Sequence, residues 1–101
     1  MIKIFESSPI SARHMRLFGQ LEAAVVSIAM NLAEGKGRFS KKEFIQYCYI
    51  ARGSLYESMT LLELFKKNLW IDQVTFDSLK SEGLEIAAMI KGLINSLKKN
   101  T

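Results

Sequence analysis

Apolar residues recur every three or four positions along most of the chain, which is the period of one face of an α-helix. No segment alternates apolar and polar residues in the way of a half-buried strand. The pattern therefore predicts three helices, over about 11–34, about 41–67 and about 73–98. Their core-facing residues are predicted to be Leu17, Leu21, Ala24, Ile28 and Leu32 in the first helix, Phe44, Cys48, Ala51, Leu55, Leu62 and Phe65 in the second, and Leu79, Ile86, Ile90, Leu93 and Leu97 in the third.

The ends of these helices are predicted from residues with strong local preferences. Gly35 and Asn68 should end the first two helices, because both accept the left-handed backbone conformation. Ser40 and Glu43 have the spacing of a capping box, in which the serine oxygen accepts a backbone N–H and the glutamate reaches back to the serine N–H. Asp72 is a natural N-cap for the third helix. Short connections place consecutive helices antiparallel, so the predicted fold is an all-α, antiparallel up-and-down helical bundle forming a single domain.

Small residues gather where the first two helices would face each other across a turn near Gly37: Ala23, Ala24 and Ser27, and Ala51, Gly53 and Ser54. A glycine inside a helix costs about 1 kcal/mol relative to alanine, so Gly53 indicates a close approach of the two backbones. Arg52 lies among these residues and would need a carboxylate if it were buried. Glu22 across the hairpin is one candidate partner, and Glu57 of a neighbouring subunit is another.

The chain has more apolar residues than one small core hides. It is 101 residues long and 49% hydrophobic, and a domain of this length buries only about 60–65% of its unfolded surface. The central helix also carries a second apolar stripe, formed by Tyr47, Ile50, Ser54, Leu61 and Leu64. Two explanations stay open. Either the helix lies in the middle of its own bundle, or this stripe, without Ser54, is the interface between copies in a homo-oligomer.

Positive charge is in moderate excess, at +4 with a pI near 9.3, which favours anionic partners. In an up-and-down bundle, the turn between the first two helices and the end of the third helix lie at the same end. Six cations then form one rim: Lys36, Arg38, Lys41, Lys42, Lys98 and Lys99. Such a rim binds phosphates with release of counterions, or it merely keeps that end solvated. The segment GKGRFSKKEF lacks the Walker spacing and follows no strand, so it is interpreted as a helix–helix turn.

Residues suited to catalysis or metal binding are sparse. His14 is the one histidine, it is predicted to be exposed, and no serine, cysteine or carboxylate is spaced to form a triad with it. Asn31, Glu34 and Glu43 lack the partner histidine that a di-iron bundle needs. The single cysteine, Cys48, excludes an internal disulfide and a zinc cluster built on cysteines. We therefore expect no enzyme activity, no cofactor, no metal and no small-molecule substrate.

The N-terminal segment MIKIFESSPI lacks the apolar run of a signal peptide. No apolar stretch reaches the roughly 18 residues that a membrane span needs. We therefore expect a cytoplasmic protein with no membrane partner.

The run SIAMNLAEGKGRFSKKEF, followed by IARGSLYE, resembles the four-helix-bundle protein family encoded in intervening sequences of 23S rRNA genes. The resemblance covers Gln20–Glu57, and the last helix matches only in its general pattern. The matching positions are Ser27, Ile28, Asn31, Ala33, Glu34, Gly35, Gly37, Arg38, Ser40, Glu43, Phe44, Ala51, Arg52, Gly53, Ser54, Leu55 and Glu57. The resemblance implies a homopentamer without enzyme activity. It also implies similarity to the accessory variability determinant of diversity-generating retroelements, which works with a reverse transcriptase and its RNA.

The chain departs from the family pattern in two places. The family has a full helix ahead of the position of Pro9, whereas eight residues precede it here, so the first helix is predicted to be truncated or absent. Members also carry basic residues where this chain has Glu22 and Ala23. The first functional hypothesis is a non-enzymatic homo-oligomeric scaffold that binds RNA or a ribonucleoprotein through the basic rim. The alternative is a protein–protein adaptor with no nucleic-acid role.

Overall fold

The computed structural model describes residues 9–99, with side chains described from residue 12 onward. Within that range the chain forms the helices α2 (Pro9–Lys36), α3 (Lys41–Lys67) and α4 (Gln73–Lys99), and no strand. The prediction of an all-α chain is confirmed, with each helix boundary within two residues of its predicted position. The truncated first helix predicted from the family pattern falls in residues 1–8 and lies outside the described residues.

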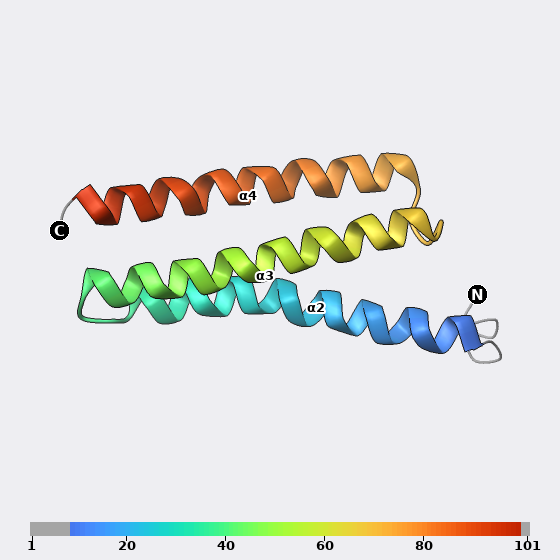
Figure 1. Cartoon of the computed structure of the whole chain (residues 1–101), viewed down its shortest axis with the longest axis horizontal. Helices are drawn as coiled ribbons and strands as arrows, with labels where there is room; N and C mark the ends of the chain where they lie inside the picture. Colours follow the sequence, from blue (N-terminus) through green and yellow to red (C-terminus); the bar gives the residue numbers. More distant parts are fainter. Residues whose placement is uncertain (1–8, 100–101) are drawn as a thin grey trace.

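The three helices run up and down with α3 between the other two (Figure 1). Both α2 and α4 pack on α3, but among the described residues no Cα atom of α2 comes within 8 Å of one in α4. The described part of the chain is therefore a three-helix arrangement that stays open on one side, and not a closed four-helix bundle.

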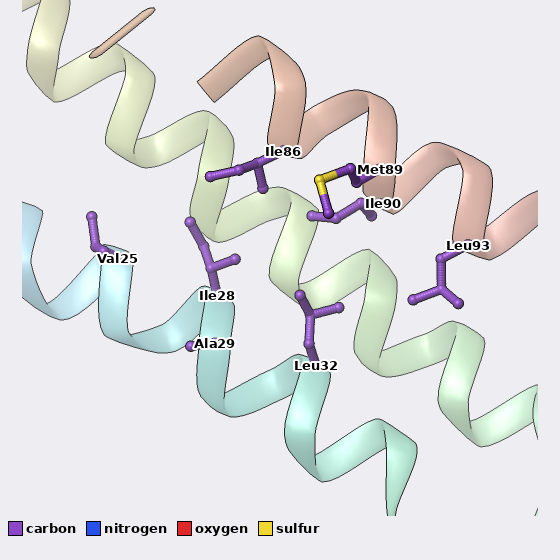
Figure 2. Close-up of a pocket in the computed structure, with 8 residues that line it drawn as sticks. All are labelled: Val25, Ile28, Ala29, Leu32, Ile86, Met89, Ile90 and Leu93. Atoms are coloured by element: carbon purple, nitrogen blue, oxygen red, sulfur yellow. The ribbon is translucent and has the colours of Figure 1, made fainter. Parts of the chain in front are cut away.

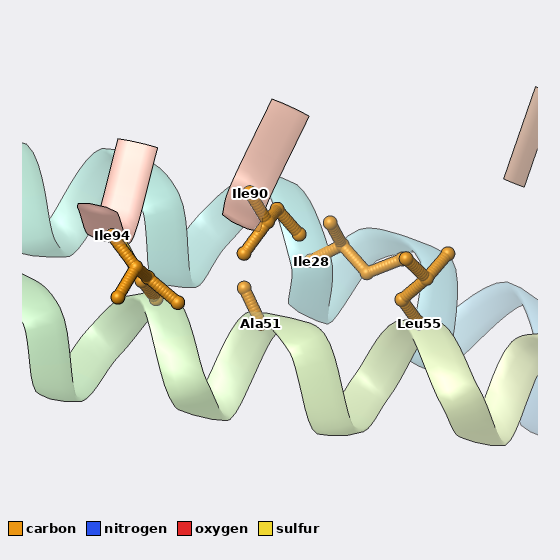
Figure 3. Close-up of a cluster of buried hydrophobic side chains, with 6 residues drawn as sticks. Ile28, Ala51, Leu55, Ile90 and Ile94 are labelled. Atoms are coloured by element: carbon orange, nitrogen blue, oxygen red, sulfur yellow. The ribbon is translucent and has the colours of Figure 1, made fainter. Parts of the chain in front are cut away.

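The core lies where all three helices meet and is formed by Ile28, Cys48, Ala51, Leu55, Ile90 and Ile94 (Figure 3). Ile90 lies against Ala51, whose small side chain lets α4 approach α3. The predicted core stripe of α3 is confirmed from Cys48 to Phe65, with Phe44 half-buried. In α4 the prediction is partly wrong, because Leu79 is 37% exposed whereas Phe76, which was not in the stripe, is 3% exposed.

A hydrogen bond between two serines joins α2 to α3. The hydroxyls of Ser27 and Ser54 lie 2.8 Å apart, and within α2 the Asn31 amide donates to the Ser27 carbonyl and hydroxyl at 2.8 and 3.0 Å. The predicted facing of small residues is confirmed for these serines. It is wrong for Gly53, which is exposed and would have no described atom within 4 Å of an added Cβ.

The glycine at the end of α2 has a different role from the one predicted. No described glycine has a positive φ, and α2 continues through Gly35 to Lys36. A Cβ at Gly35 would lie 2.7 Å from the Tyr47 Cβ and 2.9 Å from the Phe44 Cδ1. Gly35 therefore allows α2 and α3 to approach closely just before the turn, where any side chain would collide.

The left-handed residue at the end of α3 is Leu69, not Asn68. Asn68 has φ −88° and Leu69 has φ 60°. The N–H of Trp70 donates to the Phe65 carbonyl at 2.9 Å and the N–H of Leu69 to the Lys66 carbonyl at 3.0 Å, which is the bonding pattern of a Schellman motif. The prediction for Asn68 is thus wrong by one residue.

The exposure predicted for His14 is also wrong, because only 9% of the surface of His14 is exposed. The imidazole stacks on Trp70 with ring centroids 4.0 Å apart and lies 4.6 Å from the ring of Phe18. Phe65 completes the cluster, with its centroid 6.1 Å from that of His14. The α3–α4 turn carries Trp70 to the beginning of α2, so the environment of His14 depends on residues distant in the sequence.

Candidate nucleic-acid interface and self-association surface

The basic residues come together at one end of the helices. Lys36 ends α2, Lys41 begins α3 and Lys99 ends α4, and Figure 1 shows these three points at the end opposite to the α3–α4 turn. The six residues of the basic end are all exposed: Lys36, Arg38, Lys41, Lys42, Lys98 and Lys99. The topology therefore gathers cations that three separate segments contribute.

Arg38 is held in place by contacts within its own chain. Its Nη2 donates to Glu34 Oε1 at 3.0 Å and to the Tyr47 hydroxyl at 2.6 Å, and its guanidinium lies 5.0 Å from the centre of the Tyr47 ring. These contacts fix the turn and occupy donors that a phosphate would otherwise use. Arg38 is therefore a weaker candidate for phosphate binding than its exposure alone suggests.

The lysines also have a structural role. Lys36 lies in the last turn of α2, and Lys98 and Lys99 lie in the last turn of α4. Cations at these positions face the negative ends of the helix dipoles, which contributes a few tenths of a kcal/mol each. This accounts for some of the charge, but not for Lys41 and Lys42, which lie at the positive end of α3.

The beginning of α3 is fixed by its capping residues. The Glu43 N–H donates to Ser40 Oγ at 3.1 Å, as predicted. The Ser40 hydroxyl donates to Glu43 Oε1 at 3.2 Å, so the glutamate contacts the serine side chain. Between the two helices, Phe39 is the most exposed large apolar residue in the described chain, at 106% of its reference area. Phe39 was not among the predicted site residues, although its position among basic residues could have indicated it.

A groove lies between α2 and α4 on the side where the bundle is open, and side chains of these two helices line it (Figure 2). It encloses about 520 Å³. Its lining contains no polar side chain and consists of Val25, Ile28, Ala29, Leu32, Ile86, Met89, Ile90 and Leu93. Val25 and Met89 stand at its rims, 51% and 71% exposed. The groove therefore fits an apolar helix surface and offers nothing to a phosphate.

The second stripe of α3 is not one continuous exposed surface. Leu61 is only 8% exposed, so it is already covered within the chain, and Tyr47 is half-buried beneath Arg38. Ile50 and Leu64 remain 51% and 38% exposed. Of the four interface residues predicted, only these two are left largely open.

The structure does not show the ion pair predicted for Arg52. Arg52 lies 4.9 Å from the centre of the Tyr49 ring and forms no ion pair with a described carboxylate, so the predicted pairing with Glu22 is wrong. Burial raises the pKa of the Cys48 thiol.

Among residues 9–99, no group of His, Cys, Asp or Glu could hold a metal ion. None of the described helices is long and apolar enough to cross a membrane.

Comparison with protein families decides what kind of chain this is. It matches the 23S rRNA-intervening sequence protein family over residues 1–92. The chain belongs to this family. No curated protein and no solved structure matches it. The resemblance carried by Gln20–Glu57 is thus confirmed.

The residues that carry the family resemblance mostly close the α2–α3 hairpin. Ser27 and Ser54 bond across it, Glu34 holds Arg38, and Gly35 allows the close approach. The most recognisable part of the sequence therefore has a structural explanation, and a binding role must be sought in the residues that these contacts leave exposed.

Proposed function

We propose that the protein is a non-enzymatic cytoplasmic scaffold that associates with copies of itself and binds RNA, alone or in a ribonucleoprotein, through its basic end. The observation that carries the proposal is the convergence of the six cations of the basic end, from three separate segments, at one end of the helices. A polyanion gains affinity by releasing counterions when several such cations contact its phosphates.

The absence of enzyme activity is part of the proposal and is supported by the two side chains best suited to chemistry. His14 lies inside an aromatic cluster. Cys48 is fully buried, and its raised pKa disfavours the thiolate that a nucleophile needs.

Self-association is supported by the groove between α2 and α4. Full burial of a methionine side chain contributes about 1.5–3 kcal/mol. Met89 is 71% exposed, so covering it would contribute about 1–2 kcal/mol per copy. The groove has an apolar lining and apolar rims, so two copies that place their grooves face to face hide each other's exposed side chains without burying a charge.

A second copy is the occupant that we propose, because it would cover the exposed Val25 and Met89 at the rims with an equally apolar surface. A symmetric contact of this kind gives a dimer. A ring of five, which the resemblance implies, instead needs a contact between unlike surfaces, for which Ile50 and Leu64 stay exposed.

RNA binding is tested by removing charge at the basic end. The triple variant Lys36→Gln, Lys42→Gln and Lys99→Gln should weaken binding of an RNA oligomer more than about tenfold in low salt. It should also reduce the slope of log affinity against log salt by about two to three, which corresponds to the loss of about three phosphate contacts. A matched control changes Lys67, Lys80 and Lys91 to Gln, which lowers the net charge equally at exposed positions elsewhere. Equal loss in both variants would mean that only net charge matters, and an unchanged affinity in the first would refute the assignment.

Self-association is tested by light scattering on two methionine variants of similar exposure. Met89 lies at the rim of the groove and Met30 lies outside it on α2, 71% and 65% exposed. Met89→Glu should weaken association about 100-fold, because a symmetric contact loses the apolar gain twice and buries two charges. Met30→Glu should associate as the wild type does. If Met30→Glu weakened association and Met89→Glu did not, the interface would lie on the other face of α2. A monomeric wild type would refute self-association.

An adaptor with no nucleic-acid role is the second candidate, and the apolar groove favours it. An amphipathic helix of another protein would fit the same lining. In that case the purified chain is monomeric, and its partner is captured after nuclease treatment and lost on Met89→Glu.

A further inference from the structure

Phe39 stands out among the aromatic residues because nothing in the described part of the chain covers it. Its exposed fraction is 106%, whereas the next most exposed described aromatic residue, Tyr56, is at 57%. A phenyl ring held fully in water gains nothing from the fold. The ring is therefore free to be covered by a ligand, and its surroundings indicate which ligand that is.

The turn that carries Phe39 is short and internally bonded. The N–H of Gly37 donates to the carbonyls of Ala33 and Glu34 at 3.3 and 3.2 Å, and the N–H of Arg38 donates to the Gly35 carbonyl at 3.1 Å. The following residue, Ser40, caps α3. Phe39 thus projects from a backbone fixed on both sides, which limits the entropy lost when a ligand stacks on its ring.

Cations lie on both sides of Phe39 in the sequence and at the same end of the bundle. Lys36 precedes it by three residues, Lys41 and Lys42 follow within three, and α4 brings Lys99 to the same end of the bundle. All four lysines are exposed. An aromatic ring within a set of cations is the arrangement that binds single-stranded nucleic acid, because the cations contact phosphates while the ring stacks on an unpaired base.

We propose that Phe39 is the stacking platform for an unpaired base, so that the basic end binds single-stranded RNA in preference to a duplex. This inference rests on the RNA binding proposed above. Bases in a duplex are stacked on one another and present no face to a projecting ring, so the duplex can use the lysines but not Phe39. A protein interface is less favoured, because the residues next to Phe39 in the turn, Arg38 and Ser40, offer it no apolar neighbours.

The test compares fluorescence anisotropy of a labelled oligouridine of about 12 nucleotides with that of a duplex RNA of the same length, using the full chain. Phe39→Ala should weaken binding of the single strand about 5- to 150-fold, the range expected for one lost stacking contact. The slope of affinity against salt should not change, because the phosphate contacts remain. Binding of the duplex should stay within about twofold of the wild type.

Three further variants make the result specific. Phe39→Trp should restore single-strand binding because it keeps a stacking face, whereas Phe39→Leu, which is apolar but has no such face, should bind like Phe39→Ala. Tyr56→Ala, at an exposed aromatic residue on α3, should leave binding unchanged. Because Phe39 is fully exposed among the described residues, its variants should melt at the wild-type temperature.

The outcomes separate the two proposals. If the wild type binds neither RNA, the proposed function fails. If it binds both RNAs and Phe39→Ala leaves both affinities unchanged, or lowers them equally, only the role of Phe39 is refuted. Flotation with anionic phospholipid vesicles tests another use of a phenyl ring among lysines. Binding to vesicles that needs Phe39, with no effect of Phe39→Ala on RNA, would overturn the proposal in favour of a membrane surface.

Discussion

Replacing Gly35 and Gly53 by alanine should change stability in opposite directions, although both glycines lie in long helices of the same hairpin. Alanine in a helix interior is favoured over glycine by about 1 kcal/mol. At Gly53 the new Cβ would meet no described atom within 4 Å, so the whole gain should appear in the free energy of unfolding.

At Gly35 the same gain in helix stability is outweighed by a steric collision of the new Cβ with α3. The new Cβ would lie 2.7 Å from the Tyr47 Cβ and 3.3 Å from the Phe44 carbonyl oxygen, both of which are fixed by the backbone of α3. Overpacking of this kind costs about 1–3 kcal/mol. Because neither atom belongs to a mobile side-chain end, we expect the upper part of that range, and hence a net loss of about 1–2 kcal/mol.

Urea unfolding followed by circular dichroism measures both changes. It should be done at several protein concentrations, because self-association makes apparent stability depend on concentration. In thermal melts, 1 kcal/mol corresponds to about 4–8 °C for a domain near this size. Gly92→Ala is the matched control, since a Cβ at Gly92 also meets no described atom within 4 Å, and it should stabilise the protein as Gly53→Ala does.

The Gly35 and Gly53 variants test different contacts. A Gly35→Ala variant as stable as the wild type would refute the close approach of α2 and α3 at Tyr47. A loss of stability in Gly53→Ala that grows with protein concentration would mean that another copy covers this face of α3. In that case the interface would include α3, and the groove between α2 and α4 would not be the main contact.

Two further predictions concern the connection between α3 and α4. Leu69→Gly should raise the free energy of unfolding by about 1 kcal/mol. Leu69 has φ 60° and is 88% exposed, so glycine relieves backbone strain and removes little packing. A lower free energy of unfolding in urea would contradict this. Asp72 accepts the Thr75 N–H at 2.7 Å, which lowers the pKa of its carboxyl below the usual 3.8. Its stabilisation is therefore present above pH 3.8 and is lost as the pH falls through the lowered pKa, so Asp72→Ala should be less stable than the wild type at neutral pH and equal to it in strong acid. A difference that stays constant with pH would show that the cap does not act through its charge.

The helices and most of the core could be predicted from sequence because their causes are local. A period of three to four residues determines which face of each helix is apolar. Ser40 and Asp72 cap helices through contacts three residues away. The gathering of cations at one end followed from the same information, because antiparallel order alone brings the three helix ends together.

The errors occurred where a residue's role depends on a distant neighbour. Glycine is compatible with a left-handed helix end and with a crowded helix crossing, and only the position of Tyr47 against Gly35 distinguishes the two. A solitary histidine is usually exposed, but here Trp70 covers His14. Gly53 suggested a close contact that the fold does not make within the chain.

The sequence by itself determined three amphipathic helices, their ends and their antiparallel order, because these depend on backbone preferences and on the spacing of apolar side chains within a few turns. Only the tertiary structure decided that α2 and α4 remain apart, that an apolar groove opens between them, and that Phe39 is left fully in water. These features depend on the distances and angles between helices. Such quantities arise from the packing of side chains far apart in the chain, and no local pattern of residues specifies them.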